Sequence, residues 1–425
     1  RPLPPSRVAL ALDITRGLLP GEGGGRRHFW VVEQLIGAQG HDEIGYLPRP
    51  GEAAMWALQS LIHGATGLMF FRWRSAQRAQ EVFCYGVQDV DNEPGRRFFE
   101  ARSVFSFGRR YSPVIASPYV SRVAFVYSYD SVFAWQSQKQ SSSMDMEEES
   151  RRMYEPFWRW GVPIDALDAG DPGTIEALTA RTDENGTTLP RLYDIVILPA
   201  PIHVDDALFA AIYSHISNGG SVFFSFRADL KDENMAIRPK SRLADLAGVE
   251  IVEIESLNTE RIKIRKGPDY PQAKRAHSRK RETKKKNTDD VHQEITSGVW
   301  RDMLSPVEAG VEIIYRYDDE FFGDYAAVTR RRFSDTSEVV YVGCGIDIDA
   351  LLPLAGQALR NYGLLSADSK PSPSPNVEIL RRVDRKGRTW EICVNYSPHE
   401  SSWRETLIPA YTARVFSPSE LPVSP

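Results

Sequence analysis

The sequence predicts an α/β protein that ends in a small β domain. Apolar runs rich in β-branched and aromatic residues alternate with helical patterns through residues 29–71 and again through residues 122–361. After residue 375, strand-like runs follow one another without helices between them. Alternating strands and helices are typical of parallel sheets, whereas consecutive strands favour antiparallel pairing.

The composition is that of an ordinary soluble globular protein. The chain has 425 residues, of which 42% are hydrophobic and 26% charged, and this length suffices for two or three domains. Its net charge of −5 argues against a general nucleic-acid-binding surface, and no apolar run approaches the ~20 residues of a membrane span. Cys84, Cys344 and Cys393 lie too far apart to indicate a disulfide framework or a clustered zinc site. We therefore expect no cofactor, no metal, no nucleic-acid or membrane partner, and a cytoplasmic location.

The N-terminal stretch is read as a helix and a connector. Val8 to Leu19 is mainly apolar and predicts a helix that Pro20 closes. Residues 21–25 contain four glycines and resemble a phosphate loop in composition. Because no Lys-Ser/Thr follows and no helix opens after them, a flexible connector is favoured.

A strand–helix–strand unit comes next. Two strand-like runs, 29–32 and 67–71, flank a stretch at 52–63 with a broad apolar helical face. Glu33 follows the first run and Arg72 follows the second. Burying an unpaired carboxylate costs free energy, so Glu33 is expected at the solvent-accessible end of a sheet or barrel rather than in a hydrophobic core. In a parallel sheet or barrel, active-site residues lie at the carboxyl ends of the strands.

Four separated blocks in this region share one order and spacing with a known family. The blocks are Val32-Glu33-Gln34, Pro48-Arg49-Pro50-Gly51, Phe70-Phe71-Arg72-Trp73-Arg74 and Gln80-Glu81. They resemble glycoside hydrolase family 42, the β-galactosidases, and the resemblance extends nearly to the end of the chain. It implies that residues 1–112 are the C-terminal part of a (β/α)8 TIM barrel. It also implies a flavodoxin-like, trimer-forming α/β domain at 113–365, a small β-sandwich at 376–425, a small carbohydrate substrate and a homotrimer.

The resemblance assigns roles to four of these residues. In a retaining glycosidase of this family Glu33 would be the nucleophile, although a lone Glu at a strand end is more often part of a structural ion pair. Glu81 matches a residue that holds sugar hydroxyls, with a helix-surface charge as the alternative. Phe71 and Arg72 match positions that line the sugar pocket, and a core position also suits Phe71.

Two positions depart from the family pattern. His41 stands where the family usually has Trp, and Cys84 stands where it usually has a His that binds galactose hydroxyls. A thiol is a poor hydrogen-bond partner, and loss of the Trp removes a stacking surface. Galactose preference is therefore open, with an arabinopyranoside or a fucoside as alternatives. The two residues would suit a metal or thiol site only with a third ligand, and the sequence indicates none.

The unit also lacks most of a barrel. A (β/α)8 barrel needs eight strands and about 250 residues, whereas only two convincing strands precede residue 113. No segment matches the family's acid/base Glu, which follows an Asn on an earlier strand; Asn92-Glu93 precedes a helix instead. We therefore expect the C-terminal part of a longer enzyme or a truncated gene product. A non-catalytic carbohydrate-binding or assembly protein is the alternative.

The rest of the chain predicts a doubly wound α/β domain followed by antiparallel strands. The expected strands are 122–127, 194–199, 221–226, 311–317, 325–330, 338–343, 377–382, 389–396 and 413–416, and the expected helices are 91–104, 151–160, 204–217 and 350–361. Asn218-Gly219-Gly220 lies at the C-terminal end of a helix, which favours a glycine cap over a nucleotide turn.

Two further segments are distinguished by composition. Residues 257–297 are basic and contain few apolar residues, which favours a solvated, partly disordered insertion over a nuclear-localisation or polyanion-binding patch. Residues 366–375 are rich in Ser and Pro and predict a linker.

Overall fold

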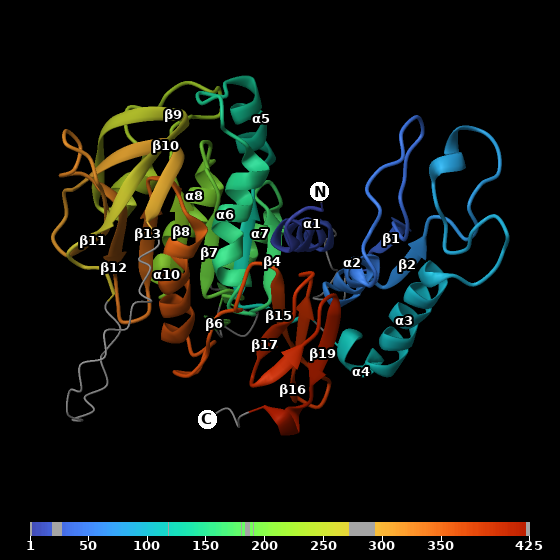
Figure 1. Ribbon diagram of the computed structural model, residues 1–425. Helices are drawn as coiled ribbons and strands as arrows, with labels where there is room; N and C mark the ends of the chain where they lie inside the picture. Colours follow the sequence, from blue (N-terminus) through green and yellow to red (C-terminus); the bar gives the residue numbers. More distant parts are fainter. Residues whose placement is uncertain are drawn as a thin grey trace, which may run out of the picture.

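The computed structural model describes residues 2–18, 28–117, 119–179, 181–182, 188–189, 191–271 and 294–421. Figure 1 shows a strand–helix unit at one end of the molecule and a large mixed sheet at the other. The C-terminal strands lie below and between these two parts, and the first helix lies in the middle of all three. The fold is therefore α/β, as the alternating strands and helices predicted.

The N-terminal unit is built on two parallel strands. Residues 30 and 31 of the first strand pair with residues 67 and 68 of the second. Its elements are α1 (Pro5–Gly17), β1 (Trp30–Gln34), α2 (Glu52–Ile62), β2 (Gly67–Phe70), the short 3₁₀ helix η2 (Gln80–Phe83), α3 (Arg96–Arg110) and α4 (Ser112–Ile115). The expected parallel pairing is confirmed, but β1 extends two residues further than residues 29–32, and α3 begins five residues later than residue 91. The glycine-rich connector at 21–25 lies outside the described residues.

A ten-stranded mixed sheet forms the main body. In spatial order its strands are β14 (Cys344–Ile346), β10 (Ile295–Pro306), β9 (Val249–Lys266), β11 (Val311–Tyr317), β12 (Ala326–Arg332), β13 (Glu338–Val342), β8 (Ser221–Ser225), β7 (Ile195–Leu198), β3 (Val123–Tyr127) and β4 (Ile164–Asp168). The strands from β13 to β4 are parallel, and those from β14 to β12 are antiparallel. The prediction of a doubly wound sheet thus describes the parallel half. It missed the strands β4, β9, β10 and β14 and the antiparallel pairing of the other half.

Helices cover both faces of this sheet. One face packs against α1, α6 (Met146–Trp158) and α10 (Ile348–Asn361), and the other packs against α7 (Pro172–Leu178), α8 (Asp206–Ser217) and α9 (Arg242–Ala247). A further helix, α5 (Tyr129–Ser137), contributes to a smaller cluster, and the short strands β5 (Arg181–Thr182) and β6 (Thr188–Leu189) pair with each other. Every residue of β7 and β8 is buried, as expected for parallel strands covered on both faces.

Local signals explain where α8 begins and ends. The Asp205 carboxylate caps the first turn and accepts a hydrogen bond from the backbone N–H of Leu208 at 2.6 Å. At the other end Gly219 adopts a positive φ of 84°, and the Gly220 N–H donates to the His215 carbonyl at 2.8 Å. This is a glycine C-cap, so the prediction for Asn218-Gly219-Gly220 is confirmed.

The expected basic insertion is shorter than predicted. Residues 257–266 continue β9, and β10 begins at Ile295, so both ends of the expected segment 257–297 belong to strands. The strands pair antiparallel, with Ile264 opposite Ile295. Most of the basic residues, from 272 to 293, lie outside the described residues.

The C-terminal part is an antiparallel sheet with an added hairpin. The sheet consists of β15 (Val377–Val383), β16 (Thr389–Asn395) and β19 (Thr412–Phe416), and the hairpin consists of β17 (Ser401–Trp403) and β18 (Thr406–Ile408). A final 3₁₀ turn, η3, spans Pro418–Glu420. The three strands of the sheet were predicted, and the hairpin was not.

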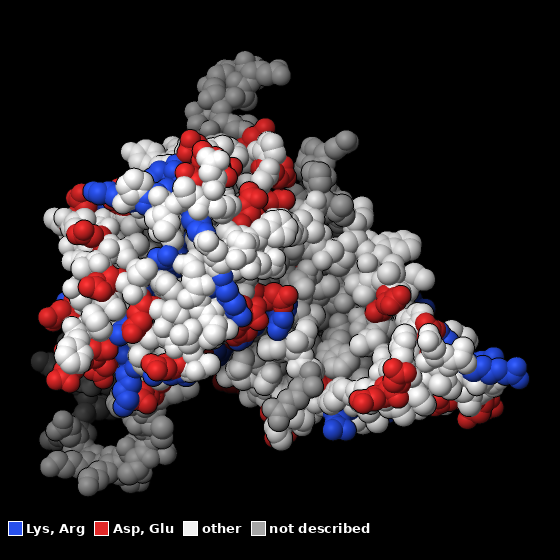
Figure 2. Space-filling view, turned by 90° about the horizontal axis from the view of Figure 1, so that it is seen from above, with Lys and Arg blue, Asp and Glu red and all other residues white. Residues whose placement is uncertain are grey.

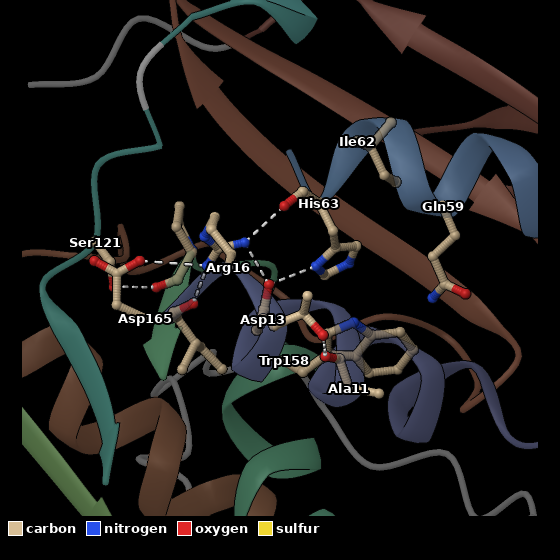
Figure 3. Close-up of polar contacts among 12 residues, drawn as sticks. Ala11, Asp13, Arg16, Gln59, Ile62, His63, Ser121, Trp158 and Asp165 are labelled. Carbon is tan, nitrogen blue, oxygen red and sulfur yellow. Dashed lines mark hydrogen bonds and ion pairs between the residues drawn. The ribbon is translucent and has the colours of Figure 1, made fainter. Parts of the chain in front are cut away.

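The three parts meet at a buried polar cluster (Figure 3). His63, which follows the last residue of α2, lies between Asp13 of α1 and Glu378 of β15, and all three side chains are fully buried. Arg16 of α1 pairs with Asp13 at 2.6 Å and donates to the His63 carbonyl at 2.7 Å. These contacts join segments that lie far apart in the sequence.

We predict that Gly51→Ala destabilises the protein more than Gly219→Ala. Both glycines have a positive φ, 87° and 84°, so each substitution carries a backbone penalty of about 1–2 kcal/mol. A Cβ on Gly51 would also lie 3.0 Å from the Tyr411 carbonyl oxygen, whereas nothing lies within 4 Å of a Cβ on Gly219. Urea unfolding of both variants gives the comparison, and equal losses would show that the contact at Gly51 carries no cost.

Candidate active site

Glu33 lies near the carboxyl end of β1, inside the strand rather than just after it. Its side chain is exposed, while the next residue, Gln34, is buried. The Phe71 N–H donates to the Gln34 carbonyl at 3.2 Å, directly after β2 ends. Because the two strands are parallel, Glu33 and Arg72 lie at the same rim of the sheet, where the sequence predicted them.

An ion pair brings Arg72 and Glu81 together. The Arg72 guanidinium pairs with the Glu81 carboxylate, and its Cζ lies 4.8 Å from the centre of the Phe71 ring. The two side chains are 26% and 44% exposed, so the pair adds little stability, on the order of 0–1 kcal/mol. The ion pair places η2, which carries Glu81, next to the end of β2. The sequence nominated all three residues and did not predict their contact.

His41 and Cys84 lie on two loops that touch each other. The Cys84 thiol is buried and donates to the Gly40 carbonyl at 3.4 Å, and the Tyr85 N–H donates to the Ala38 carbonyl at 3.0 Å. His41 is exposed. Across the described ranges, no group of three or more His, Cys, Asp or Glu side chains is arranged to hold a metal ion.

The Pro48-Arg49-Pro50-Gly51 block forms the entrance to α2. Glu52, in the first turn, accepts from the Arg49 N–H at 2.8 Å and from the Tyr46 hydroxyl at 2.9 Å. Partial burial and then the Glu52 carboxylate raise the pKa of Tyr46, which therefore stays a neutral donor.

Two residues of α3 hold this block from outside. Arg96 donates to the Pro48 carbonyl at 3.2 Å, and Glu100 accepts from the Gly51 N–H at 2.9 Å. The block is thus a structural support for the unit that carries Glu33. Sequence reasoning missed the supporting residues, because their partners lie more than forty positions away, at separations of 48 and 49.

The two strands expose one apolar face. Leu68 and Phe70 pack toward α2 and α3, whereas Met69, on the opposite side of the strand, is 52% exposed. Trp30 and Val32 of β1 are 64% and 58% exposed. Among the residues that the structure describes, no third strand pairs with β1 or β2.

On the face shown in Figure 2, basic side chains occur among acidic ones rather than as a large basic area. In the described part of the chain, no helix is both long and apolar enough to span a bilayer.

Family models cover two separate regions of the chain. The model described as "Beta-galactosidase", for glycoside hydrolase 42, matches residues 3–107. The model described as "Beta-galactosidase trimerisation domain" matches residues 187–364. The first match contains Glu33 and all the other candidate site residues.

Curated relatives and solved structures agree with these matches. The β-galactosidase Bga of Halorubrum lacusprofundi is 26% identical over 397 residues, covering 91% of this chain and 49% of that protein. BgaA of Clostridium cellulovorans is 26% identical over 356 residues, covering 83% of this chain and 47% of that protein. The chain thus spans about half the length of the curated relatives that it matches.

The fold is also shared. The crystal structure of a β-galactosidase from Bacillus circulans sp. alkalophilus matches 97% of this chain and 58% of its own, with a TM-score of 0.77 and 19% identity. The Halorubrum lacusprofundi β-galactosidase structure matches 97% of this chain and 56% of its own, with a TM-score of 0.73 and 23% identity. These likenesses show the shared fold, and the two family models, which match residues 3–107 and 187–364, show together with the curated relatives that the chain belongs to glycoside hydrolase family 42.

Proposed function

We propose that this protein is a retaining glycoside hydrolase that cleaves terminal β-D-galactosides, with Glu33 as its nucleophile. The observation that carries the proposal is the exposed Glu33 carboxylate beside the Phe71–Arg72 segment, at the carboxyl end of two parallel strands in a family 42 chain. Chemistry in (β/α)8 barrels takes place at that end of the strands. A carboxylate there can attack the anomeric carbon and form the glycosyl-enzyme intermediate.

The neighbouring groups suit a sugar pocket. Arg72 and Glu81 offer paired hydrogen-bonding groups, which match the vicinal hydroxyls of a sugar. Phe71 lies under the Arg72 guanidinium and adds an aromatic surface at the same rim. The ion pair between Arg72 and Glu81 places both groups side by side at this rim.

The second catalytic carboxyl group belongs to another part of the barrel in this proposal. A retaining mechanism needs an acid/base residue about 5–5.5 Å from the nucleophile. Asn92-Glu93 has the dipeptide of the family's acid/base segment, but Glu93 is exposed in the loop that precedes α3 and follows no strand of the barrel unit. In this proposal, barrel strands that continue the sheet beyond the outer edges of β1 and β2 are the source of this group.

We predict that residues 1–425 alone hydrolyse nitrophenyl β-galactoside at or near background. A longer protein that contains these residues and a complete barrel, called the parent below, should be active. General acid catalysis contributes about 10²–10⁴-fold, and the absent barrel walls also remove substrate positioning. In the parent, Glu33→Gln should lower turnover at least about a thousandfold without unfolding the protein. The assay compares these three proteins, with Glu93→Gln in the parent as a matched control that keeps activity. Robust activity of the 425-residue chain, or of the Glu33→Gln parent, would contradict the proposal.

We predict that His41→Trp together with Cys84→His raises galactoside turnover in the parent at least about tenfold. Each restored sugar contact is worth about 1–3 kcal/mol in the transition state. His41 is exposed and can be enlarged freely, whereas a His at position 84 must displace the contact between Cys84 and the Gly40 carbonyl. The measurement is the ratio of kcat/KM for galactosides to that for arabinopyranosides and fucosides, with His399→Trp as a control at an exposed histidine of the C-terminal part. An unchanged ratio would show that the two departures do not set the sugar.

We predict a homotrimer assembled through the α/β part. The support is the match of residues 187–364 to the trimerisation-domain model, which runs from before β7 to after α10. Light scattering over a dilution series should report the mass of three chains for the parent. A stable monomer at micromolar concentration would contradict this assembly.

A further inference from the structure

The buried cluster around His63 has a geometry that fixes its protonation state. Nδ1 of the ring lies 2.8 Å from Asp13 Oδ1, and Nε2 lies 2.6 Å from Glu378 Oε1. Both carboxylates also receive hydrogen bonds from other groups. An ionised carboxylate only accepts, so a ring bonded to two of them must carry a proton on both nitrogens. The geometry is therefore that of an imidazolium.

Both carboxyl groups accept hydrogen bonds from several further donors, an arrangement that suits ionised carboxylates. Asp13 accepts from Arg16 at 2.6 Å and from the Tyr154 hydroxyl at 2.6 Å. Glu378 accepts from the Trp158 indole N–H at 2.8 Å, the Gln59 amide at 3.1 Å and the Tyr396 hydroxyl at 2.7 Å. The Arg, Trp and Gln nitrogens can only donate, so the carboxylate oxygens must accept.

The charged groups of the cluster and those next to it are balanced when His63 is protonated. The cations are Arg16 of α1, Arg382 of β15 and the imidazolium, and the anions are Asp13, Glu378 and Asp165 of β4. Burial raises the pKa of the nearby phenols Tyr119, Tyr154 and Tyr396, which remain neutral. Loss of the His63 proton would leave two buried carboxylates competing for one neutral ring.

The pKa of His63 agrees with this geometry. Burial alone would lower it, but the negative charges of Asp13 and Glu378 outweigh burial and raise it to about 9. The pKa of Asp13 is in turn lowered: burial raises it, and Arg16 and His63 more than reverse that effect.

The cluster is also connected to the strand that carries Glu33. On the same helix, α2, the Ser60 hydroxyl lies 3.4 Å from the Gln34 side-chain oxygen, and Gln34 follows Glu33 directly. After α2, the Thr66 N–H donates to the Phe29 carbonyl at 2.9 Å, just before β1 begins. Arg382 of β15 donates to the Ile62 carbonyl at 3.0 Å. Helix α2 therefore contacts the C-terminal sheet through one set of groups and β1 through another.

We propose that protonated His63 is a lock between the three parts of the chain, and that its deprotonation releases α1 and β15 from α2 and loosens the β1–β2 unit. The proposal does not rest on the proposed hydrolysis, because no residue of the lock belongs to the candidate site. The lock is a positioning device: it acts on Glu33 through α2 and Gln34.

The direction of the pH effect follows from linkage. The folded state binds the His63 proton more tightly than the unfolded state, whose value is near 6.5, against about 9 in the folded protein. The stabilisation is therefore fully present below about pH 6.5 and is lost as the pH rises through about 9. Over that window one extra proton is released whenever the lock opens.

The test is hydrogen exchange of the 425-residue chain as a function of pH, after correction for intrinsic exchange rates. The opening equilibrium for peptides covering α2 and β15 should rise about tenfold per pH unit between about 6.5 and 9, with β1 following. In His63→Gln this step should disappear, and exchange should already be fast at neutral pH. His203→Gln is the control, because His203 is also buried but bonds to the Lys231 carbonyl, away from the cluster.

Two results would overturn the proposal. One is exchange of α2 and β15 in the wild-type protein with no step above neutral pH; the other is a step of the same size in His63→Gln. If His63→Gln does not fold, Glu378→Gln retains the side-chain volume and should lower the pH of the step. The imidazole carbon shifts of the unmodified protein give a direct measurement, and titration of His63 at or below its ordinary value would equally refute the lock.

Discussion

A charged imidazole buried between two carboxylates holds the three parts of this chain together. Removing one partner of such a buried set costs about 3–5 kcal/mol, because the remaining charges are left uncompensated away from water. A set of this kind adds little net stability compared with apolar packing, but it accepts only one relative placement of its members. The positions of α1, α2 and β15 are therefore set by charge geometry rather than by the area of their contact.

The elements of the fold were predictable where one local pattern decided the structure. The continuous apolar runs of β7 and β8 and the capped, glycine-terminated α8 were read correctly, because burial and caps act over a few residues. The antiparallel extension of β9 was missed. Its outer part alternates Ile262 and Ile264 with Arg261, Lys263 and Arg265, a period of two that suits a half-exposed strand, but its net charge suggested an insertion.

The candidate site was likewise predictable only in part from the sequence. Family resemblance nominated Glu33, Phe71, Arg72 and Glu81 one by one, and the parallel pairing of β1 and β2 was predictable from the strand–helix–strand order. The sequence could not show that Arg72 turns to Glu81, nor that Cys84 turns its thiol to the Gly40 carbonyl. The cluster at His63 could not be predicted from the sequence, because Asp13 lies 50 residues from His63 along the chain and Glu378 lies 315 residues from it.

The pairing of Ile264 with Ile295 has a consequence for how this chain tolerates change. It brings the two ends of the intervening segment side by side, as neighbours across a β ladder. Once the ends of a loop are held together, each doubling of its length costs only about 0.6 kcal/mol in chain entropy. The β9–β10 ladder therefore keeps Ile264 opposite Ile295 whatever length of sequence joins the two strands, so a change of length there should leave the register of the ten-stranded sheet unaltered.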